Sequence, residues 1–232
     1  MEAVILAGGF GTRLRAVVPD LPKPLAPVAG RPFLAILLAE LARQGFTRAV
    51  LAVGYRHEQI RAEFGECFQG IELAYAVEET PLGTGGAIRQ ASRLCNGEEM
   101  FVLNGDSFVE LDYAEMRSRH RADGAPLSIC AVAVSDGSRY GQLVIEDGHV
   151  TGFAEKGGRG AGRINAGVYL FAPRLIQGED LPEAFSFEQD FLTPRLHELH
   201  PCAFMANGLF IDIGVPEDYA RAEQLFAPSA AK

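Results

Sequence analysis

The first half of the chain alternates short, uninterrupted apolar runs with stretches in which apolar residues recur every three or four positions. Uninterrupted runs predict buried parallel strands, and the longer spacing predicts amphipathic helices. Pro32 suits the first turn of one such helix, and Gly45 suits its end. The pattern predicts strands at residues 3–7, 49–53, 71–77 and 100–103 and helices at 32–44, 57–64 and 84–94.

The second half changes character because strand-like runs follow one another directly. They are expected at residues 127–134, 142–145, 150–154 and 163–171, with Glu146-Asp147-Gly148 as a hairpin turn. Helical spacing returns at 187–199 and at 216–226, with a short strand at 209–211 between them. The sequence therefore predicts parallel βαβ units in the first half and a mixed or antiparallel sheet in the second.

Length and composition restrict the class of protein. A chain of 232 residues, 48% hydrophobic and 22% charged, can bury the core of one α/β domain, expected at residues 1–226 and followed by a flexible tail at 227–232. The net charge of -9 argues against nucleic acid or a membrane surface as the main partner. Unpaired cysteine spacing, the absence of a membrane-length apolar stretch and the lack of a basic leader predict a cytoplasmic protein.

A glycine-rich turn, residues 8–11, follows the first predicted strand and leaves backbone N–H groups open to a closely bound anion. It lacks the Gly-Lys-Ser/Thr of a Walker loop, and Leu14 stands where a dinucleotide-binding loop has its third glycine. The turn carries Arg13 instead, and Lys23 follows ten residues later between two prolines. A guanidinium fork and a compact ammonium together can hold a triphosphate and offset its charge.

Residues 6–14 (LAGGFGTRL), together with Pro22-Lys23-Pro24-Leu25, resemble the signature of the sugar-1-phosphate nucleotidylyltransferases, also called nucleotide-sugar pyrophosphorylases. This resemblance implies a Rossmann-like three-layer α/β/α nucleotidyltransferase fold with a mixed, mostly parallel sheet. It also implies transfer of a nucleoside monophosphate from a nucleoside triphosphate to a sugar 1-phosphate, with Mg2+ as cofactor and pyrophosphate as product. One departure is Ala16, where the family usually has proline.

The resemblance assigns Arg13 and Lys23 as the catalytic cations. It places the nucleotide against Leu6, Ala7, Gly8, Gly9, Gly11, Thr12, Glu78, Gly83 and Thr84. Glu78 or Glu79 could accept two hydrogen bonds from the N1–H and N2–H2 edge of guanine, whereas uracil and thymine each offer one N–H donor. This favours GTP, although two solvated carboxylates at a strand end are the alternative interpretation. Thr84 is also suited to capping the helix that follows.

Two aspartates are expected at the edge where a parallel sheet binds its ligands. Asp106 follows the fourth strand, Asp212 follows the strand at 209–211, and both resemble the magnesium-binding aspartates of the family. Mg2+ favours one or two carboxylates completed by phosphate oxygens and water. His197 and His200 lie three residues apart but lack a third ligand of matching spacing, so no metal site is expected there.

The resemblance also supplies a sugar-phosphate half-site. Its expected members are Asn104, Gly141, Glu155, Lys156 and Asn165. Lys156 would hold the phosphate, Glu155 and Asn165 would bind sugar hydroxyls, and Gly141 would contribute its backbone. The glycine-rich residues 157–162 that follow Lys156 could fold over a bound substrate.

Within the family, the chain is most similar to the heptose 1-phosphate guanylyltransferases, which supply a GDP-heptose for bacterial surface polysaccharide. The alternatives are a mannose or other hexose 1-phosphate guanylyltransferase, and a uridylyl- or thymidylyltransferase. A non-catalytic regulatory subunit that senses nucleotide sugars ranks lower, because Arg13, Lys23, Asp106 and Asp212 are all present. Whether the chain forms a homo-oligomer stays open.

Overall fold

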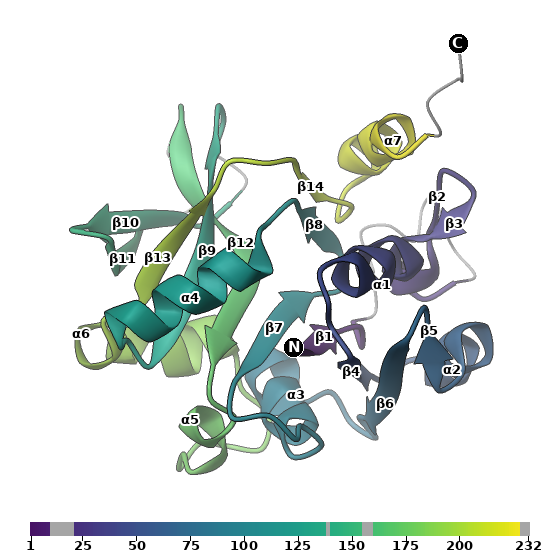
Figure 1. The fold of residues 1–232 in the computed structure, drawn as a ribbon, viewed down its shortest axis with the longest axis horizontal. Coiled ribbons are helices and arrows are strands. Elements are labelled where there is room, and N and C mark those ends of the chain that lie inside the picture. Colours follow the sequence, from purple (N-terminus) through teal and green to yellow (C-terminus); the bar gives the residue numbers. More distant parts are fainter. Residues whose placement is uncertain (10–20, 138–139, 155–159, 228–232) are drawn as a thin grey trace.

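The computed structural model describes residues 1–9, 21–137, 140–154 and 160–227, and these residues form a sheet with helices on both faces (Figure 1). Within the described residues the main sheet has ten strands in the order β10-β11-β13-β9-β12-β7-β1-β4-β6-β5. Apart from Ala227, the expected tail lies outside them. None of the described helices is both long and apolar enough to cross a membrane.

One half of the sheet contains the four strands that the apolar runs predict. These strands are β1 (Glu2–Leu6), β4 (Arg48–Val53), β6 (Ile71–Val77) and β7 (Met100–Asn104). They pair in parallel, β1 with β4 and β7, and β4 with β6. Their carboxyl ends therefore meet along one edge of the sheet, which is where parallel α/β proteins bind ligands.

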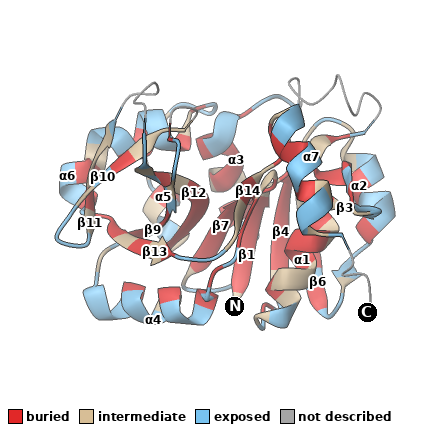
Figure 2. Cartoon of the chain, turned by 90° about the horizontal axis from the view of Figure 1, so that it is seen from above, coloured by how far each residue is buried: buried red, intermediate tan, exposed pale blue. Residues whose placement is uncertain are grey.

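Helices cover both faces of these strands and make a three-layer arrangement, as predicted. Along β1, Ala3 and Ile5 join the core formed with α1 (Phe33–Arg43), whereas Val4 joins the core formed with α3 (Gly83–Ser92). This alternation follows from the two-residue period of a strand. Figure 2 shows the buried strands between helices whose outer surfaces are exposed. A third helix, α2 (His57–Phe64), lies beside the end of the sheet that carries β5 and β6.

The second half is largely antiparallel, as its strand pattern predicts. Its strands are β9 (Leu127–Val134), β10 (Gln142–Glu146), β11 (His149–Ala154), β12 (Gly162–Phe171) and β13 (Cys202–Ala206). β12 runs antiparallel to both β7 and β9, whereas β13 pairs in parallel with β9 and antiparallel with β11. The predicted hairpin joins β10 to β11, with Asp147 and Gly148 at φ values of 47° and 82°, which suit a tight two-residue turn.

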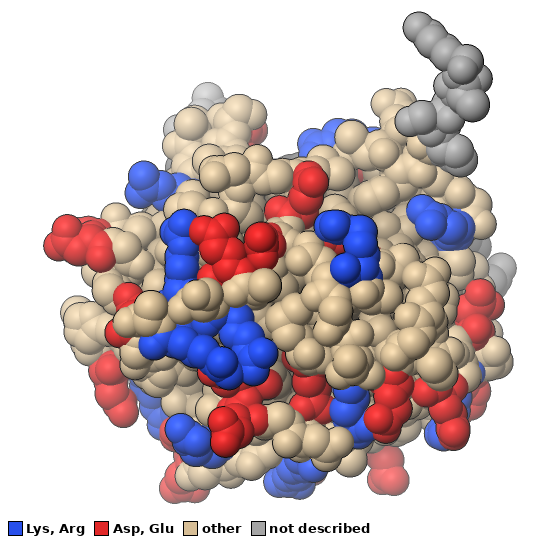
Figure 3. All heavy atoms as spheres, in the orientation of Figure 1, with Lys and Arg blue, Asp and Glu red and all other residues tan. Residues whose placement is uncertain are grey.

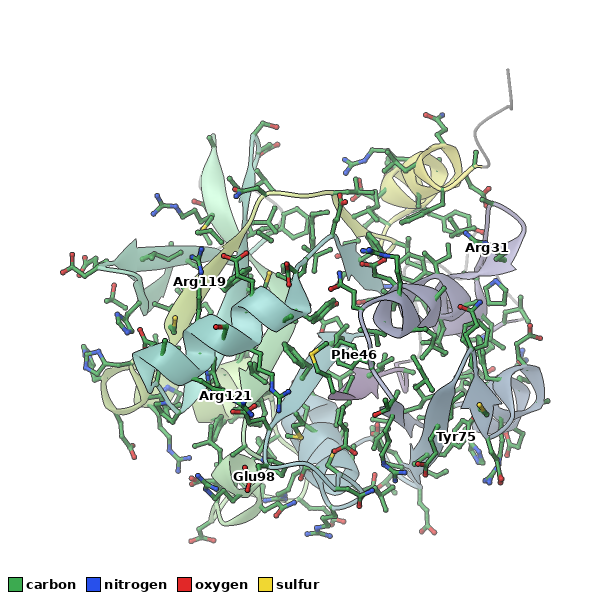
Figure 4. All side chains as sticks on the ribbon, viewed as in Figure 1. Arg31, Phe46, Tyr75, Glu98, Arg119 and Arg121 are labelled. Atoms are coloured by element: carbon green, nitrogen blue, oxygen red, sulfur yellow. The ribbon has the colours of Figure 1, made fainter. Side chains whose placement is uncertain are left out.

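Several elements were not predicted. The longest is α4 (Tyr113–Asp123), whose apolar pattern is sparse because only Tyr113, Met116 and His120 of its residues are buried. Phe46, labelled in Figure 4, contacts it, with ring centroids 5.1 Å from Tyr113 and 5.4 Å from Phe101 of β7. The other unpredicted elements are β13, α5 (Arg174–Gln177), η1 (Lys23–Leu25), β2 (Pro27–Val28), β3 (Arg31–Pro32), β5 (Cys67–Phe68) and β8 (Ser107–Val109).

Residues 187–199 are helical, as their spacing predicts, but they do not form one regular α-helix. The segment forms three short helices: a π-helix, η2 (Phe187–Leu192), a 3-10 turn, η3 (Thr193–Arg195), and α6 (Leu196–Leu199). Pro194 lacks an N–H donor, which is consistent with the break at η3.

The C-terminal elements bring the end of the chain back to its beginning. The short strand β14 (Phe210–Asp212) pairs with β8 instead of joining the main sheet. α7 (Pro216–Leu225) then lies near β2 and β3 (Figure 1), where Glu223 accepts a 2.9 Å hydrogen bond from the Ala29 backbone N–H.

Candidate active site

A pocket of about 610 Å³ opens at the carboxyl ends of β1, β4, β6 and β7. The predicted site residues that line it are Leu6, Ala7, Gly8, Gly9, Lys23, Glu78, Gly83, Thr84, Asn104 and Asp106. Pro24, Gly54, Tyr55, Glu79, Thr80, Pro81, Ala87 and Gly105 line it as well. Segments far apart in sequence therefore meet in one cavity of a size that suits a small-molecule ligand.

Glycines let the strand ends approach one another closely at the base of this pocket. A Cβ on Gly8 would lie 2.8 Å from Glu78 Oε1 and 3.2 Å from the Gly54 nitrogen. A Cβ on Gly105 would lie 2.5 Å from the carbonyl oxygen of Leu6. Any larger residue would push the strand ends apart, so the glycines are required by the close approach of the backbones.

The Glu78 carboxylate turns back over Gly8, and its Oε2 accepts a 3.1 Å hydrogen bond from the Leu82 backbone N–H. Burial raises the pKa of this carboxyl above its usual value, and the hydrogen bond from Leu82 opposes the shift. Glu79 also lines the pocket but is exposed. Both candidates for reading the base thus lie at the pocket, and Glu78 is the one held in place by the fold.

Lys23 forms an ion pair with Asp106, a residue 83 positions away, and its own side chain is only 10% exposed. Asp212 reaches the same place from β14, because Asp212 is paired with Ser107 and the Ile213 N–H donates to the carbonyl of Asp106 at 2.9 Å. A Cβ on Gly214 would lie 2.8 Å from Asp212 Oδ1 and 3.3 Å from Lys23 Nζ. The structure therefore brings the ammonium and both predicted metal-binding aspartates together.

No group of three or more His, Cys, Asp or Glu side chains arranged to hold a metal ion occurs among the described residues. A pair of carboxylates next to this pocket fits Mg2+, which takes one or two carboxylates and completes its shell with phosphate oxygens and water. Asp106 and Asp212 match that donor set.

Thr84 does not cap its own helix, contrary to the prediction. α3 begins at Gly83 without a side-chain cap, and the Thr84 hydroxyl instead accepts a 2.9 Å hydrogen bond from the Phe187 backbone N–H. The neighbouring Gly85 N–H donates to the carbonyl of Phe185 at 2.9 Å. The segment before η2, remote in sequence, therefore fixes the loop that lines the pocket.

The sugar-phosphate residues predicted from the resemblance are only partly brought together. Asn104 lines the pocket and lies against Gly167, where a Cβ would be 2.3 Å from Asn104 Nδ2. Asn165 is not among the residues that line the pocket but is connected to Asn104 through Gly167, because its Oδ1 accepts a 3.0 Å hydrogen bond from the Gly167 N–H. Gly141 does not line the pocket. Gly11, Thr12, Arg13, Glu155 and Lys156 lie outside the described residues, as does Ala16.

Sequence reasoning missed several residues at or beside this site. Gly54 and Tyr55 line the pocket directly after β4, and the strand-end rule that identified Asp106 would have found them. Tyr169 and Glu188 both bind Asn165. No sequence feature pointed to Glu188. In the helical segment expected at 187–199 it looks like any other polar residue on the surface of a helix.

Charged side chains elsewhere on the surface are mostly interspersed. Figure 3 shows basic and acidic groups side by side on the face that carries α4. There, Arg117 and Arg121 both donate to Glu99 at 2.8 Å. The basic residues of this face are thus partly neutralised by the neighbouring Glu99 carboxylate.

Comparison with known proteins gives consistent results. The model of the family described as "Nucleotidyl transferase" matches residues 2–228. A D-glycero-alpha-D-manno-heptose 1-phosphate guanylyltransferase of Aneurinibacillus thermoaerophilus is 42% identical over 224 residues, 97% of each chain. The crystal structure of HddC from Yersinia pseudotuberculosis complexed with GMP-PN superposes with a TM-score of 0.87, at 38% identity over 97% of this chain and 99% of that one. A mannose-1-phosphate guanylyltransferase catalytic subunit beta of Dictyostelium discoideum is 33% identical over 99% of this chain and 65% of the relative.

Proposed function

The chain belongs to the nucleotidyl transferase family, and from that premise we propose that it transfers GMP from GTP to a manno-heptose 1-phosphate, giving a GDP-heptose and pyrophosphate. The protein is an enzyme, a nucleotidyltransferase. Two relatives of matching length are heptose 1-phosphate guanylyltransferases, which favours this donor and this acceptor. The reaction would take place in the cytoplasm and supply a nucleotide sugar for polysaccharide synthesis.

One observation supports the proposal most directly. The pocket at the strand ends is lined both by glycines and by the Lys23–Asp106 ion pair. Glycine lets a phosphate come close enough for backbone N–H groups to donate hydrogen bonds to its oxygens, and the lysine ammonium offsets the negative charge of the phosphate. Asp212 lies beside the same ammonium. This combination fits a nucleoside triphosphate better than an uncharged ligand.

The reaction follows from these positions. An oxygen of the sugar 1-phosphate attacks the α-phosphorus of GTP in line, the bond from that phosphorus to the bridging oxygen breaks, and pyrophosphate departs. The attacking oxygen is already ionised at neutral pH, so no general base is needed. Catalysis then depends on orientation and on stabilising charge as it moves toward the leaving group.

Lys23 is the described residue best placed to stabilise that charge, and Arg13 and Lys156 are proposed to assist it. Asp106 and Asp212 would hold Mg2+, which offsets phosphate charge when bound. Because Lys23 already pairs with Asp106, the cation and the carboxylate are held ready before substrate arrives. This preorganisation avoids a reorientation cost during the reaction.

Glu78 is proposed to select guanine. Its Oε1 lies beside Gly8 in the pocket while Oε2 is engaged by the Leu82 N–H, so the position of the carboxylate is fixed. A fixed acceptor discriminates best, because a base without matching donors leaves a partly buried charge unpaired.

A second acceptor is mannose 1-phosphate. The mannose 1-phosphate guanylyltransferase from Dictyostelium matches 99% of this chain, although the chain spans only 65% of that relative. Mannose and the manno-heptoses share the ring configuration, so discrimination between them depends on the substituent beyond the ring.

The test is a pyrophosphate-release assay in Mg2+ that crosses GTP, UTP, dTTP, CTP and ATP with manno-heptose, mannose and glucose 1-phosphates. GTP with the heptose 1-phosphate should give the highest kcat/KM. Lys23→Ala should lower kcat by about two orders of magnitude, whereas Arg93→Ala, which removes an exposed cation at the end of α3, should leave it unchanged. Activity confined to UTP would refute the guanylyl assignment, and unchanged turnover in Lys23→Ala would remove Lys23 from the mechanism.

A further inference from the structure

Glu188 lies beside the sugar half-site and is tied to it by hydrogen bonds. Its Oε1 accepts from Asn165 Nδ2 at 2.6 Å and from the Tyr169 hydroxyl at 2.9 Å. Asn165 in turn contacts Gly167, and Gly167 lies against Asn104 in the wall of the pocket. A continuous line of contacts therefore runs from the pocket to Glu188.

The amide of Asn165 is almost fully used within the protein. Nδ2 donates to Tyr169 and Glu188, both at 2.6 Å, and Oδ1 accepts from the Gly167 N–H at 3.0 Å. An amide group has two donor hydrogens and two acceptor positions, so only one acceptor position is left for a ligand. Asn165 alone is thus poorly equipped to bind several sugar hydroxyls.

The carboxylate of Glu188 has the free hydrogen-bond acceptor positions that Asn165 lacks. The hydrogen bonds it receives from the described residues all fall on Oε1, and the residue is exposed. Its Oε2 can therefore accept further donors. Carboxylates accept strong, charge-assisted hydrogen bonds from hydroxyl groups, of which a sugar phosphate has several.

The position of Glu188 is also unusually well fixed for an exposed glutamate. The preceding residue, Phe187, is 1% exposed, stacks on Phe171 and Phe191, and donates its N–H to Thr84 in the nucleotide loop. Glu188 is the second residue of the π-helix η2 (Phe187–Leu192), a conformation that often occurs at functional sites. Tyr169 beneath it is buried, and burial together with the Glu188 charge raises the pKa of its phenol, so Tyr169 stays a neutral donor.

Building on the function proposed above, we propose that Glu188 is a specificity-determining residue whose Oε2 accepts a hydrogen bond from a hydroxyl of the sugar 1-phosphate. Asn165 and Tyr169 position the carboxylate by occupying Oε1. Residues 185–188 then link the two half-sites. Phe185 and Phe187 form hydrogen bonds with Gly85 and Thr84 beside the nucleotide pocket, and Glu188 binds the sugar.

Glu188→Gln tests this directly. The oxygen of the new amide must face the two donors, Asn165 and Tyr169, so its NH2 group replaces Oε2 and turns an acceptor into a donor. The KM for manno-heptose 1-phosphate should rise about tenfold or more, while the KM for GTP should change by less than about twofold. The matched control is Glu183→Gln, an exposed glutamate on the same segment of chain.

Analogues of manno-heptose 1-phosphate, each lacking one hydroxyl, separate direct contact from a structural effect. With the wild type, removing the hydroxyl that Glu188 accepts should raise KM about tenfold. With Glu188→Gln, removing that same hydroxyl should change KM by less than about twofold, because the interaction is already lost. If Glu188→Gln fails to fold, Glu188→Asp, which withdraws the carboxylate, replaces it in the same comparison.

Two results would overturn the proposal. Equal losses for every analogue in the wild type and the variant would show that Glu188 contacts no hydroxyl. If Glu188→Gln raised the KM for manno-heptose 1-phosphate and the KM for GTP by the same factor, Glu188 would have a structural role only. If the wild type uses no sugar 1-phosphate at all, the proposed function fails and this inference with it, whereas an active wild type with equal losses refutes this inference alone.

Discussion

At the scale of single residues, the site depends on charges held by the fold before any ligand binds. Lys23 is largely buried, and its ion pair with Asp106 offsets the cost of placing an ammonium there. Asp212 lies next to the same ammonium. Glu78 differs from these residues, because burial is the main influence on the pKa of its carboxyl and raises it, against the opposing hydrogen bond from the Leu82 N–H.

The raised pKa of Glu78 predicts how stability depends on pH. Burial lifts this pKa above the usual 4.5, so the folded protein holds the proton to a higher pH than the unfolded chain does. The contribution of Glu78 to the free energy of unfolding should therefore fall as pH rises from 4.5 through the raised pKa. Glu78→Gln has no such group and can still accept from the Leu82 N–H.

Urea unfolding of the wild type and Glu78→Gln at several pH values measures this effect. As the pH rises from about 4 to about 7, the unfolding free energy of the wild type should fall relative to that of Glu78→Gln. Glu79→Gln, which changes the exposed neighbour, is the control. A difference that is the same at every pH would show that burial does not perturb Glu78.

At the scale of elements, the start of α3 and residues 185–188 form one unit. Gly83, Gly85 and Gly86 of α3 leave no room for side chains, because the chain at 183–185 lies directly against them. Arg89 closes the contact with hydrogen bonds to the carbonyls of Leu181 and Pro182. The loop that lines the nucleotide pocket is thus shaped by a segment about a hundred residues away.

Gly85→Ala tests this packing. The new Cβ would lie 2.1 Å from a carbon of the Phe185 ring, so Phe185 must move and the segment with it. The free energy of unfolding should fall by about 1–3 kcal/mol, and the KM for GTP should rise as the loop shifts. Chemical denaturation and steady-state kinetics measure the two effects.

The control is Gly152→Ala, a strand glycine at which a Cβ would make ordinary contacts of 3.5 Å with Val144. It should cost less stability and leave the KM for GTP unaltered. A Gly85→Ala protein as stable as this control would mean that the contact with Phe185 is not tight.

At the scale of the whole molecule, the sheet joins two different halves around one pocket. The parallel half supplies the glycine turn, Glu78 and Asp106 at its strand ends. The antiparallel half supplies Asn165 on β12, which pairs with β7, and the short β14–β8 pairing adds Asp212. Nucleotide and sugar phosphate can therefore meet at the boundary between halves.

This arrangement predicts that metal dependence needs both aspartates. Chelation of Mg2+ should abolish pyrophosphate release, and Asp106→Asn and Asp212→Asn should each raise the Mg2+ concentration for half-maximal activity about tenfold or more, because each removes one carboxylate. GTP with Mg2+ should raise the Tm of the wild type by mass action, and the gain should shrink in both variants. Asp180→Asn, at an exposed position that does not line the pocket, is the control. Wild-type metal dependence in Asp212→Asn would exclude Asp212 as a ligand.

The sequence by itself determined the alternation of strands and helices in the first half, the change to antiparallel strands in the second and the family, because buried runs and glycine turns are local features. Its motifs also predicted many of the residues that line the pocket, although not Gly54 or Tyr55. It did not reveal α4, whose few buried side chains leave little periodicity, or the break of the helix at 187–199. Only the tertiary structure decided that Lys23, Asp106 and Asp212 adjoin, that Thr84 binds Phe187, and that Glu188 reaches Asn165. These contacts join positions remote in sequence, and the pairing of strands fixes them, which no local pattern encodes.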